Sequence, residues 1–400
     1  MIWKKMEVFK SPHSILEGGD LSGYKKKVFN KNEYFEFTIL GEDFYLRKDL
    51  AEVVDKQFFE IRTDLNSWEV SEDDNDIHED IYSSMAASMA IEGEVFSEKQ
   101  LKNNEILKEF NKLTNKVFEA TKNLDKKMLN GLQNIGIVTG TNFIISEMEN
   151  KQPLSDTNLE ILYTMLSAGG ALLSENERIL PDNLYREGEV DIVGSSVGKR
   201  VAAGLSSDKL NKHMKEFQRF YNQNTLFDPF QTGAIIHFLF VYIHPYFDMN
   251  GRTARILHDS YLYKHGLRNT TSLMNVVISM NKPDYYKAVQ WSRETKDLSY
   301  FVGFMYYQYL VSNVVNKFIA NIEENDIFLT KTQKRYYMMA IFYRKMFTWQ
   351  QIDKTMRLTY NKTLTKQGIM STLNTMVDLG VLKAEIKNGV KAYTAIYMKD

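Results

Sequence analysis

The sequence predicts a mainly α-helical protein, because its composition disfavours extensive β-structure and most of its length has helical periodicity. It contains 6 prolines and 21 glycines in 400 residues, below ordinary usage, while 44% of its residues are apolar. Between residues 81 and 323, apolar residues recur at helical spacing. We therefore expect a helical bundle over 81–323, a small α+β region over 1–80 and a separate module over 324–400.

The N-terminal region, residues 1–80, mixes strand and helix signals. Alternation at Phe35, Phe37 and Ile39 predicts a half-buried strand, and residues 50–68 carry apolar side chains at helical spacing. The acidic run at 71–80 is typical of a solvated linker.

Several element boundaries in the bundle have local signals. Asp228 followed by Pro229 predicts an N-cap, and the run 229–243 is apolar nearly all round, which predicts a buried central helix. Residues 185–204 alternate and then turn at 194–198, which predicts a β-hairpin. Capping boxes predict three further helix starts, at Ser97 with Gln100, Thr157 with Glu160 and Ser174 with Glu177.

The C-terminal module, residues 324–400, has the element order of a winged helix. Thr348 and Gln351 cap a short helix, and a second helix over 365–379 ends at Gly380. Asn388 and Gly389 then join two strand-like runs, a strong hairpin signal. Helix, turn, helix and β-wing together predict a winged-helix domain.

Charge is divided unevenly between this module and the rest of the chain. The net charge is −1, but residues 326–400 hold 13 Lys and Arg against 5 Asp and Glu, a net of +8 that leaves −9 for residues 1–325. A DNA-binding regulator is therefore a competing function, with a protein-interaction module as the other use of such a domain. Phosphate contacts would come from lysines around the second helix and wing: Lys362, Lys366, Lys387 and Lys391.

Composition also excludes several classes of protein. The absence of cysteine excludes disulfides, thiolate metal sites and a cysteine nucleophile. The N-terminus lacks the apolar stretch of a signal peptide, and no run approaches the roughly 18 apolar residues of a membrane span. We expect a soluble, cytoplasmic protein with no membrane contact.

The segment after the central helix, residues 244–255, combines groups suited to a polyphosphate. His244 offers an imidazole, and Asp248 is a hard oxygen ligand suited to Mg²⁺. Arg252 and Arg255 lie three apart, on one face of a helix predicted from about 250 to 264. The first amides of that helix and its dipole also favour anions. Together these groups predict a polyphosphate site.

This segment resembles the signature of the Fic (filamentation induced by cAMP) family, H-P-F-x-D-G-N-G-R-x-x-R. The resemblance extends over about 80–310 and includes a double tyrosine downstream. It implies a Fic-type helical bundle that transfers AMP from ATP to a protein hydroxyl, with Mg²⁺ as cofactor and pyrophosphate as product. The matching residues are His244, Pro245, Tyr246, Phe247, Asp248, Met249, Asn250, Gly251, Arg252, Thr253, Ala254 and Arg255.

The resemblance implies roles for the base, the metal ligand and an aromatic residue. His244 would be the general base that takes the proton of the attacking hydroxyl, which suits an imidazole near its working pH. Asp248 would hold the Mg²⁺ that bridges the α- and β-phosphates. Tyr286, at the double tyrosine, would pack near the adenine, with an ordinary core aromatic as the equal alternative.

The remaining matched residues would bind the phosphates. The resemblance implies that Asn250 and Gly251, beside Met249, line the anion hole. Arg252 and Arg255 would neutralise the remaining charge, with Arg255 toward the γ-phosphate.

The sequence departs from the family pattern at three places. Met249 replaces a glycine, so its side chain either crowds the phosphates or points away, and a left-handed backbone there would be strained. Tyr246 replaces phenylalanine and would keep the packing. The hairpin at 190–201 corresponds to the flap that docks a target peptide by strand addition, with Val201-Ala202-Ala203 where paired prolines often follow.

A second motif lies upstream, at residues 88–93. Apolar and small side chains fall on one face of a predicted helix over 81–93, and Gly93 suits its C-cap. Glu92 in the last turn opposes the helix dipole and calls for a compensating partner. In Fic proteins the pattern S/T-x-x-x-E-G/N marks an inhibitory helix whose glutamate pairs with the second signature arginine. The resemblance therefore implies that Ser88, Glu92 and Gly93 inhibit, with Glu92 against Arg255.

We therefore predict an autoinhibited protein adenylyltransferase that acts on a Ser, Thr or Tyr hydroxyl of an unidentified target protein or of itself. Removal of AMP is an alternative, because some family members use the same glutamate to position a water. A homodimer stays open.

Overall fold

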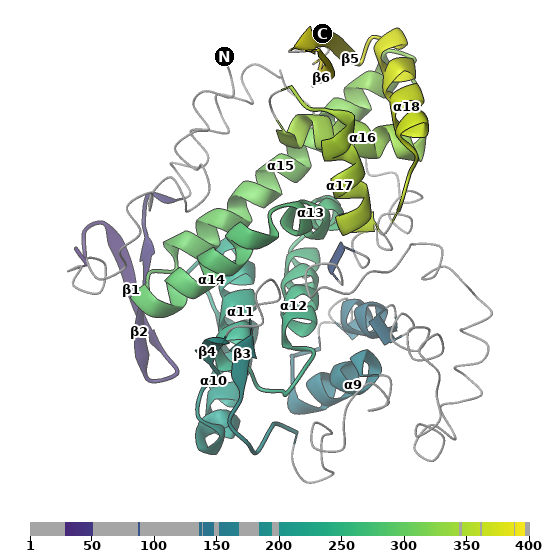
Figure 1. The fold of residues 1–400 in the computed structure, drawn as a ribbon. Coiled ribbons are helices and arrows are strands. Elements are labelled where there is room, and N and C mark those ends of the chain that lie inside the picture. The colour runs from purple at the N-terminus through teal and green to yellow at the C-terminus, as the bar shows by residue number, and fades with distance from the viewer. Residues whose placement is uncertain are drawn as a thin grey trace, which may run out of the picture.

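The computed structural model describes residues 29–50, 87–88, 136–137, 139–147, 152–167, 184–193, 200–343, 346–360, 362–387 and 389–396. Most of these residues are helical, and the strands among them form separate two-stranded antiparallel sheets. The predicted mainly α-helical class is confirmed. Figure 1 shows helices α16 to α18 at one end of the molecule and the hairpin β1–β2 along one side.

The labelled elements follow one another along the chain in this order: β1 Tyr34–Ile39, β2 Glu42–Arg47, α9 Asp156–Leu166, β3 Asp191–Val193, β4 Arg200–Ala203, the 3₁₀ helix η5 Ser207–Lys209, α10 Leu210–Gln223, α11 Pro229–Ile243, α12 Asn250–Lys264, α13 Arg268–Met280, α14 Lys282–Thr295, α15 Ser299–Glu324, α16 Lys331–Tyr343, α17 Trp349–Tyr360, α18 Lys366–Asp378, β5 Leu382–Lys387 and β6 Val390–Ala395.

Helix α11 is buried on nearly every side, as predicted. Asp228 Oδ1 accepts the N–H of Gln231 at 2.9 Å, and Pro229 occupies the first turn, so the predicted start is confirmed. Helices α10, α12 and α15 pack around it. Even the polar Thr232 and His237 of this helix are fully buried. Its C-terminal end therefore has a fixed position in the core.

The hairpin β1–β2 contains the strand predicted near Phe35, which is confirmed, and packs on the bundle. Phe44 of β2 is fully buried, with its ring 6.1 Å from that of Phe238 in α11. The N–H of Tyr45 donates to the carbonyl of Lys296 at 2.9 Å. This hairpin therefore shares one hydrophobic core with the central helix.

Helix α9 begins earlier than predicted. Ser155 Oγ accepts the N–H of Asn158 at 3.3 Å, and Asn158 Oδ1 accepts the N–H of Ser155 at 3.1 Å. Asparagine at the third helical position returns the bond as a glutamate would, and Asp156 in the first turn favours the dipole. The predicted cap at Thr157 with Glu160 is therefore wrong.

The hairpin predicted over 185–204 is confirmed as β3–β4. Asp191 pairs with Ala203, and a bulge follows Ile192. The N–H of Gly204 donates to the carbonyl of Val190 at 2.9 Å and closes the open end of the hairpin. The predicted turn at 194–198 lies outside the described residues.

The C-terminal elements follow the predicted order. The N–H of Thr348 donates to Gln351 Oε1 at 2.8 Å, Thr365 caps α18, and Gly380 ends it with φ of 76°. Strands β5 and β6 pair around Gly389. These elements share a second hydrophobic core with α13 and α15. The assignment of this order to a winged-helix domain stays a prediction.

Other predicted features fall partly or wholly outside the described residues. These are the caps at Ser97 and Ser174, the linker at 71–80 and the helix at 50–68 beyond Leu50. Of the predicted helix 81–93, residues 87 and 88 are described and are helical. Among the described helices, none is both long enough and apolar enough to cross a membrane. The domain boundaries at 80 and 323 stay predictions.

Candidate functional site

The loop between α11 and α12 is bounded by two residues in left-handed conformations. α11 ends at Ile243 and α12 begins at Asn250, as predicted. His244 has φ of 55° and Met249 has φ of 67°, each a strain of about 1 kcal/mol for a residue other than glycine. The loop thus brings His244 and the N-terminus of α12 to the same end of the helix pair.

His244, the predicted base, is half-buried at the C-terminus of α11. Its backbone N–H donates to the carbonyl of Phe240 at 3.0 Å, the last bond of the helix. Its Nδ1 lies 3.4 Å from the carbonyl of Val241. A carbonyl at that position favours the tautomer with the proton on Nδ1, which makes Nε2 the basic nitrogen. This is the arrangement that a general base needs.

The side chain of Asn250 holds the loop in shape. Its Oδ1 accepts the N–H of Tyr246 at 3.0 Å, and its Nδ2 donates to the carbonyl of Tyr246 at 2.8 Å. The Thr253 hydroxyl donates to the carbonyl of Met249 at 2.9 Å. Because the side chain of Asn250 is engaged in these bonds, the expected phosphate contact would come from its backbone amide. That amide and the amide of Gly251 have no intrahelical acceptor.

Asp248, the predicted metal ligand, is exposed at the tip of this loop. Its Oδ1 accepts the N–H of Met249 at 2.6 Å. One exposed carboxylate beside the N-terminal amides of α12 fits Mg²⁺, which commonly takes one or two carboxylates together with substrate phosphates. Within the described residues there is no group of three or more His, Cys, Asp or Glu able to hold a metal. An ion at Asp248 would therefore depend on phosphate oxygens for further ligands.

Met249 packs on the first signature arginine. Its side chain is 2% exposed, and its Sδ lies 2.9 Å from Nη1 of Arg252, itself 3% exposed. The side chain therefore points into the protein. The predicted backbone strain at this departure from the family glycine is present.

Tyr246 packs as a phenylalanine would. Its buried ring lies 4.1 Å from that of Tyr163, between centroids. Burial raises the pKa of its phenol well above the usual value. Its hydroxyl has no hydrogen-bond partner in the described part of the chain. The packing expected at this substitution is therefore kept, with a buried polar atom added.

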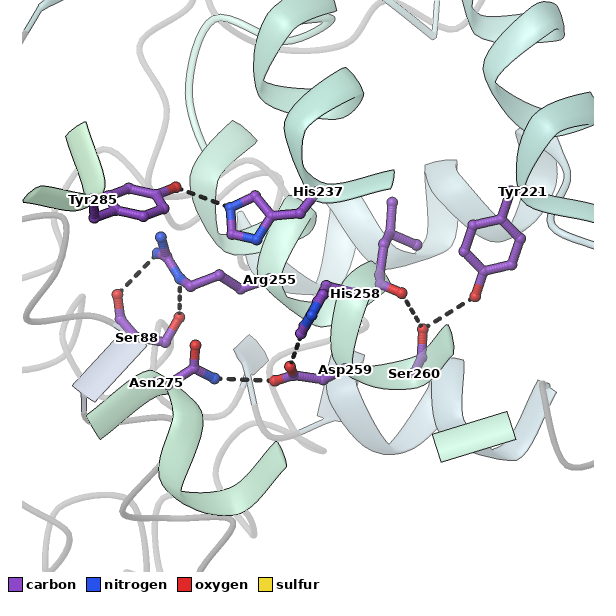
Figure 2. Close-up of polar contacts among 10 residues, drawn as sticks. Ser88, Tyr221, His237, Arg255, His258, Asp259, Ser260, Asn275 and Tyr285 are labelled. Atoms are coloured by element: carbon purple, nitrogen blue, oxygen red, sulfur yellow. Dashed lines mark hydrogen bonds and ion pairs between the residues drawn. The ribbon is translucent and has the colours of Figure 1, made fainter. Parts of the chain in front are cut away.

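The second signature arginine contacts the predicted inhibitory segment. Arg255 is 1% exposed; its Nε donates to Ser88 Oγ at 2.7 Å, and its Nη2 donates to the carbonyl of Ser88 at 2.9 Å. Figure 2 shows both bonds, with Tyr285 and His237 beyond the guanidinium. Two residues placed 167 positions apart in the sequence are therefore joined at the site. Glu92 and Gly93 lie outside the described residues.

Comparison with known proteins gives the family of this site. The profile of the Fic/DOC family matches residues 171–262, which include the whole signature. A Fido domain-containing protein of Dictyostelium discoideum is 30% identical over 115 residues, which are 28% of this chain and 72% of that protein. The chain belongs to the Fic/DOC family.

Two further similar proteins are another Fic protein, of which a smaller share is matched, and a solved structure of lower identity. The "Protein adenylyltransferase Fic" of Aedes aegypti is 32% identical over 94 residues, which are 23% of this chain and 18% of that protein. The crystal structure of a Fic family protein from Desulfovibrio desulfuricans G20 aligns with a TM-score of 0.45 at 18% identity. That alignment covers 82% of this chain and 90% of the other.

Buried polar residues behind Arg255 were missed by the sequence analysis. His237 Nε2 lies 2.9 Å from the hydroxyl of Tyr285, and His258 Nδ1 lies 2.8 Å from Asp259 Oδ1 (Figure 2). Burial lowers the pKa of His237 well below its usual value, and nearby His258 and Arg255 lower it further. The available signal was a histidine inside the apolar run 229–243. These groups surround the arginine expected to meet the γ-phosphate.

Tyr286, the predicted adenine contact, is half-buried beside Tyr285. The two rings meet edge to face with centroids 5.1 Å apart, and Tyr286 packs against the main core. Both alternatives for this residue, adenine contact and core aromatic, agree with that position. Its role stays a prediction.

The four lysines expected to contact DNA differ in their surroundings. Lys366 and Lys387 are exposed. Lys391 Nζ donates to Asn374 Oδ1 at 2.7 Å, which ties it to α18. Lys362 is half-buried, and burial together with nearby positive charge lowers its pKa. Two of the four lysines are therefore exposed, and their contact with DNA stays a prediction.

Proposed function

We propose that this Fic protein is an autoinhibited adenylyltransferase that moves AMP from ATP to a Ser, Thr or Tyr hydroxyl of a target protein or of the chain itself. One observation supports it best. The loop between α11 and α12 brings together a candidate base, a candidate anion site and an arginine that is bonded to the upstream segment. His244 stands at one end of that loop, and Arg255 is bonded to Ser88 at the other.

The proposed reaction is an in-line displacement at the α-phosphorus of ATP. The acceptor hydroxyl gives its proton to His244 Nε2, and its oxygen forms a bond to the α-phosphorus. The bond from that phosphorus to the bridging oxygen breaks, and pyrophosphate leaves. Catalysis then consists of positioning and charge stabilisation, to which a single positioned base contributes roughly 10²- to 10⁴-fold.

The N-terminus of α12 would carry the phosphates. The amides of Asn250 and Gly251 face an anion with the positive end of the helix dipole behind them. Asp248 would hold Mg²⁺, which neutralises phosphate charge when it is bound. Arg252 and Arg255 would complete this site, since a guanidinium fork matches phosphate oxygens. To bind a phosphate, the Arg252 guanidinium must either turn away from the Met249 sulfur or keep that contact through one nitrogen and use the others.

The inhibition is supported by the contact between Ser88 and Arg255. A residue four positions after a helical serine lies on the same helical face, so Glu92 would approach the same guanidinium. A glutamate there would compete with the γ-phosphate for Arg255 by charge and by volume. We therefore propose that ATP binds in an unproductive position until this segment moves.

The test compares AMP incorporation by the wild-type chain, Glu92→Gly and Glu92→Gly/His244→Ala. With Mg²⁺ and labelled ATP, Glu92→Gly should incorporate more AMP than wild type. The double variant should incorporate AMP at least about 100-fold more slowly than Glu92→Gly. Mass spectrometry of the chain identifies the donor group and any modified side chain. Equal incorporation with and without Glu92 contradicts the inhibition; incorporation that survives loss of His244 contradicts the base.

The alternative is that the same site removes AMP from a modified protein instead of adding it. It predicts that wild type, rather than Glu92→Gly, releases AMP from chain modified beforehand by Glu92→Gly. That comparison uses the same two proteins and separates the two directions.

DNA binding is a second candidate, supported by the net charge of +8 over residues 326–400 and the exposure of Lys366 and Lys387. Phosphate contacts by these lysines would make binding to a duplex fall steeply with salt. Lys366→Glu/Lys387→Glu in the full chain should abolish such a mobility shift. No shift of wild type at low salt rejects this candidate.

A further inference from the structure

The C-terminal end of α11 is held from outside the helix. The last carbonyls of a helix lack intrahelical donors, yet the carbonyls of residues 242 and 243 at the end of α11, and those of residues 244 and 245 just after it, all accept bonds from other segments. Two of the donors belong to Arg186: its Nε binds the carbonyl of His244 at 2.8 Å, and its backbone N–H binds that of Pro245 at 3.0 Å. The proposed base is therefore fixed through its own carbonyl.

The rest of the Arg186 guanidinium holds the flap hairpin β3–β4. Nη1 donates to the carbonyl of Gly188, before β3, at 2.5 Å, and Nη2 donates to the carbonyl of Leu205, after β4. The N–H of Leu205 in turn donates to the carbonyl of Ile243 at 3.3 Å. One side chain thus joins both ends of the flap to the residue that starts the catalytic loop.

The surroundings of Arg186 are built for this contact. The residue is 5% exposed, and each of its three guanidinium nitrogens donates to a backbone carbonyl. A Cβ at Gly204 would lie 2.5 Å from Nη2 of Arg186, so glycine leaves the space for the guanidinium. Burial lowers the pKa of Arg186, although arginine stays charged in proteins. A buried cation needs compensation, which these carbonyls supply.

A second arginine holds the same end from the other side. Arg293 of α14 donates from Nη1 to the carbonyl of Tyr242 at 3.1 Å and from Nη2 to the carbonyl of Ala203 in β4. Its guanidinium lies 4.6 Å from the centre of the Tyr242 ring. The flap and the end of α11 are therefore clamped as one unit.

We propose that Arg186 is a positioning residue of the transfer reaction, which fixes the left-handed His244 against the flap that presents the acceptor hydroxyl. This inference rests on the proposed adenylyltransferase function. His244 at φ of 55° needs its neighbours to keep it in that conformation. A planar fork serves three carbonyls at once, whereas a lysine ammonium cannot reproduce that geometry.

The experiment places Arg186→Lys in the Glu92→Gly background. The matched control is Arg335→Lys in the same background, since Arg335 is 6% exposed and lies in α16, in the other core. We expect Arg186→Lys to lower the rate of automodification at saturating ATP by roughly 10- to 100-fold, as a small misplacement of a base does. Titration with ATP should show undiminished stoichiometry and a similar Kd, which partial unfolding would not allow.

Hydrogen exchange supplies a readout that does not require activity. Arg186→Lys should speed exchange at the amides of residues 186 and 203–205 while leaving α16 unchanged. Gly204→Ala is a second variant that displaces the same guanidinium without removing it, and it should have both effects in weaker form. It also covers the case in which Arg186→Lys fails to fold.

The outcomes separate the two proposals. If Glu92→Gly transfers no AMP, the proposed function fails. Hydrogen exchange at residues 203–205 then decides by itself whether Arg186 positions the flap. If Glu92→Gly is active but Arg186→Lys matches Arg335→Lys in rate, the positioning role is overturned. Unchanged exchange at residues 203–205 in both Arg186→Lys and Gly204→Ala overturns it as well.

Discussion

The two ends of the proposed catalytic loop are stabilised in different ways. The end proposed to bind phosphate, residues 246–253, is held by its own hydrogen bonds: Asn250 bonds the backbone of Tyr246, and Thr253 bonds the carbonyl of Met249. The base end, residues 242–245, depends on Arg186 and Arg293 from distant segments. The signature motif therefore carries its own scaffold for the proposed phosphate site, while the position of the proposed base depends on residues outside the motif.

The largest effect should come from Asn250→Ala at the self-supported end. The substitution leaves the buried N–H and carbonyl of Tyr246 without their partners, and we expect the free energy of unfolding to fall by about 2–4 kcal/mol. Denaturant titration measures this loss. ATP binding should weaken too, because the loop carries the amides of the anion site.

Asn222→Ala is the matched control for that variant. Asn222 bonds the N–H and carbonyl of Leu154, each at 2.9 Å, so its alanine variant loses the same kind of bond pair outside the signature. Its stability should fall similarly while its ATP affinity is kept. Equal ATP affinity in the two variants would show that Asn250 does not shape the phosphate end.

An intermediate effect is expected at Met249. Met249→Gly relieves about 1 kcal/mol of left-handed strain but deletes a buried side chain worth about 2–5 kcal/mol, so packing wins and stability falls. Met249→Ala loses nearly the same packing and keeps the strain. The glycine variant should therefore be about 1 kcal/mol more stable than the alanine variant by denaturant titration. The opposite order would contradict the left-handed backbone at this residue.

The smallest effect concerns Glu42, which supports the base end from β2. The hydroxyl of Tyr242 donates to Glu42 Oε2 at 2.6 Å, and Lys296 forms an ion pair with the same oxygen. Desolvation raises the pKa of Glu42, but these hydrogen bonds and the charges of Lys296 and Arg293 outweigh it and lower the pKa below 4.5. The pair is partly exposed, so it contributes at most about 1 kcal/mol.

The sign of the pH dependence follows from that lowered pKa. The stabilisation by Glu42 is complete above its unfolded pKa and is lost as pH falls through the lower folded value. Wild type should thus exceed Glu42→Gln in stability at pH 7, and the gap should narrow and close as the pH falls through the lowered folded pKa. Glu36→Gln, which breaks an exposed pair with Lys31, serves as the control with little effect at either pH. A gap that persists in acid would contradict the role of the charge.

Local signals predicted much of the fold, including the ends of the two helices that flank the loop. Asp228 with Pro229 and the run behind them fixed the start and burial of α11, since caps and periodicity are properties of neighbouring residues. Local signals also compete: Ser155 and Thr157 both suit a cap, and the chain uses Ser155 because Asn158 returns its bond. The choice between adjacent caps depends on such geometry.

The clamp at the base end had no sequence signal. Arg186 binds backbone carbonyls, which every residue possesses, and its His244 partner lies 58 positions away. The resemblance to Fic proteins predicted the motif at 88–93 to meet Arg255 through Glu92, whereas the contact that the structure describes is made by Ser88. Contacts between distant segments are properties of the assembled fold, so residues that act through them are found in the structure.

The bond between Ser88 and Arg255 also has a consequence for the order of synthesis. Ser88 leaves the ribosome 167 residues ahead of Arg255, a lead of roughly 10–30 s at ordinary translation rates. The upstream segment is therefore complete before the helix that carries the arginine exists. A newly made chain therefore has Ser88 available from the first moment that the helix carrying Arg255 can form, so the proposed restraint is synthesised before the proposed site.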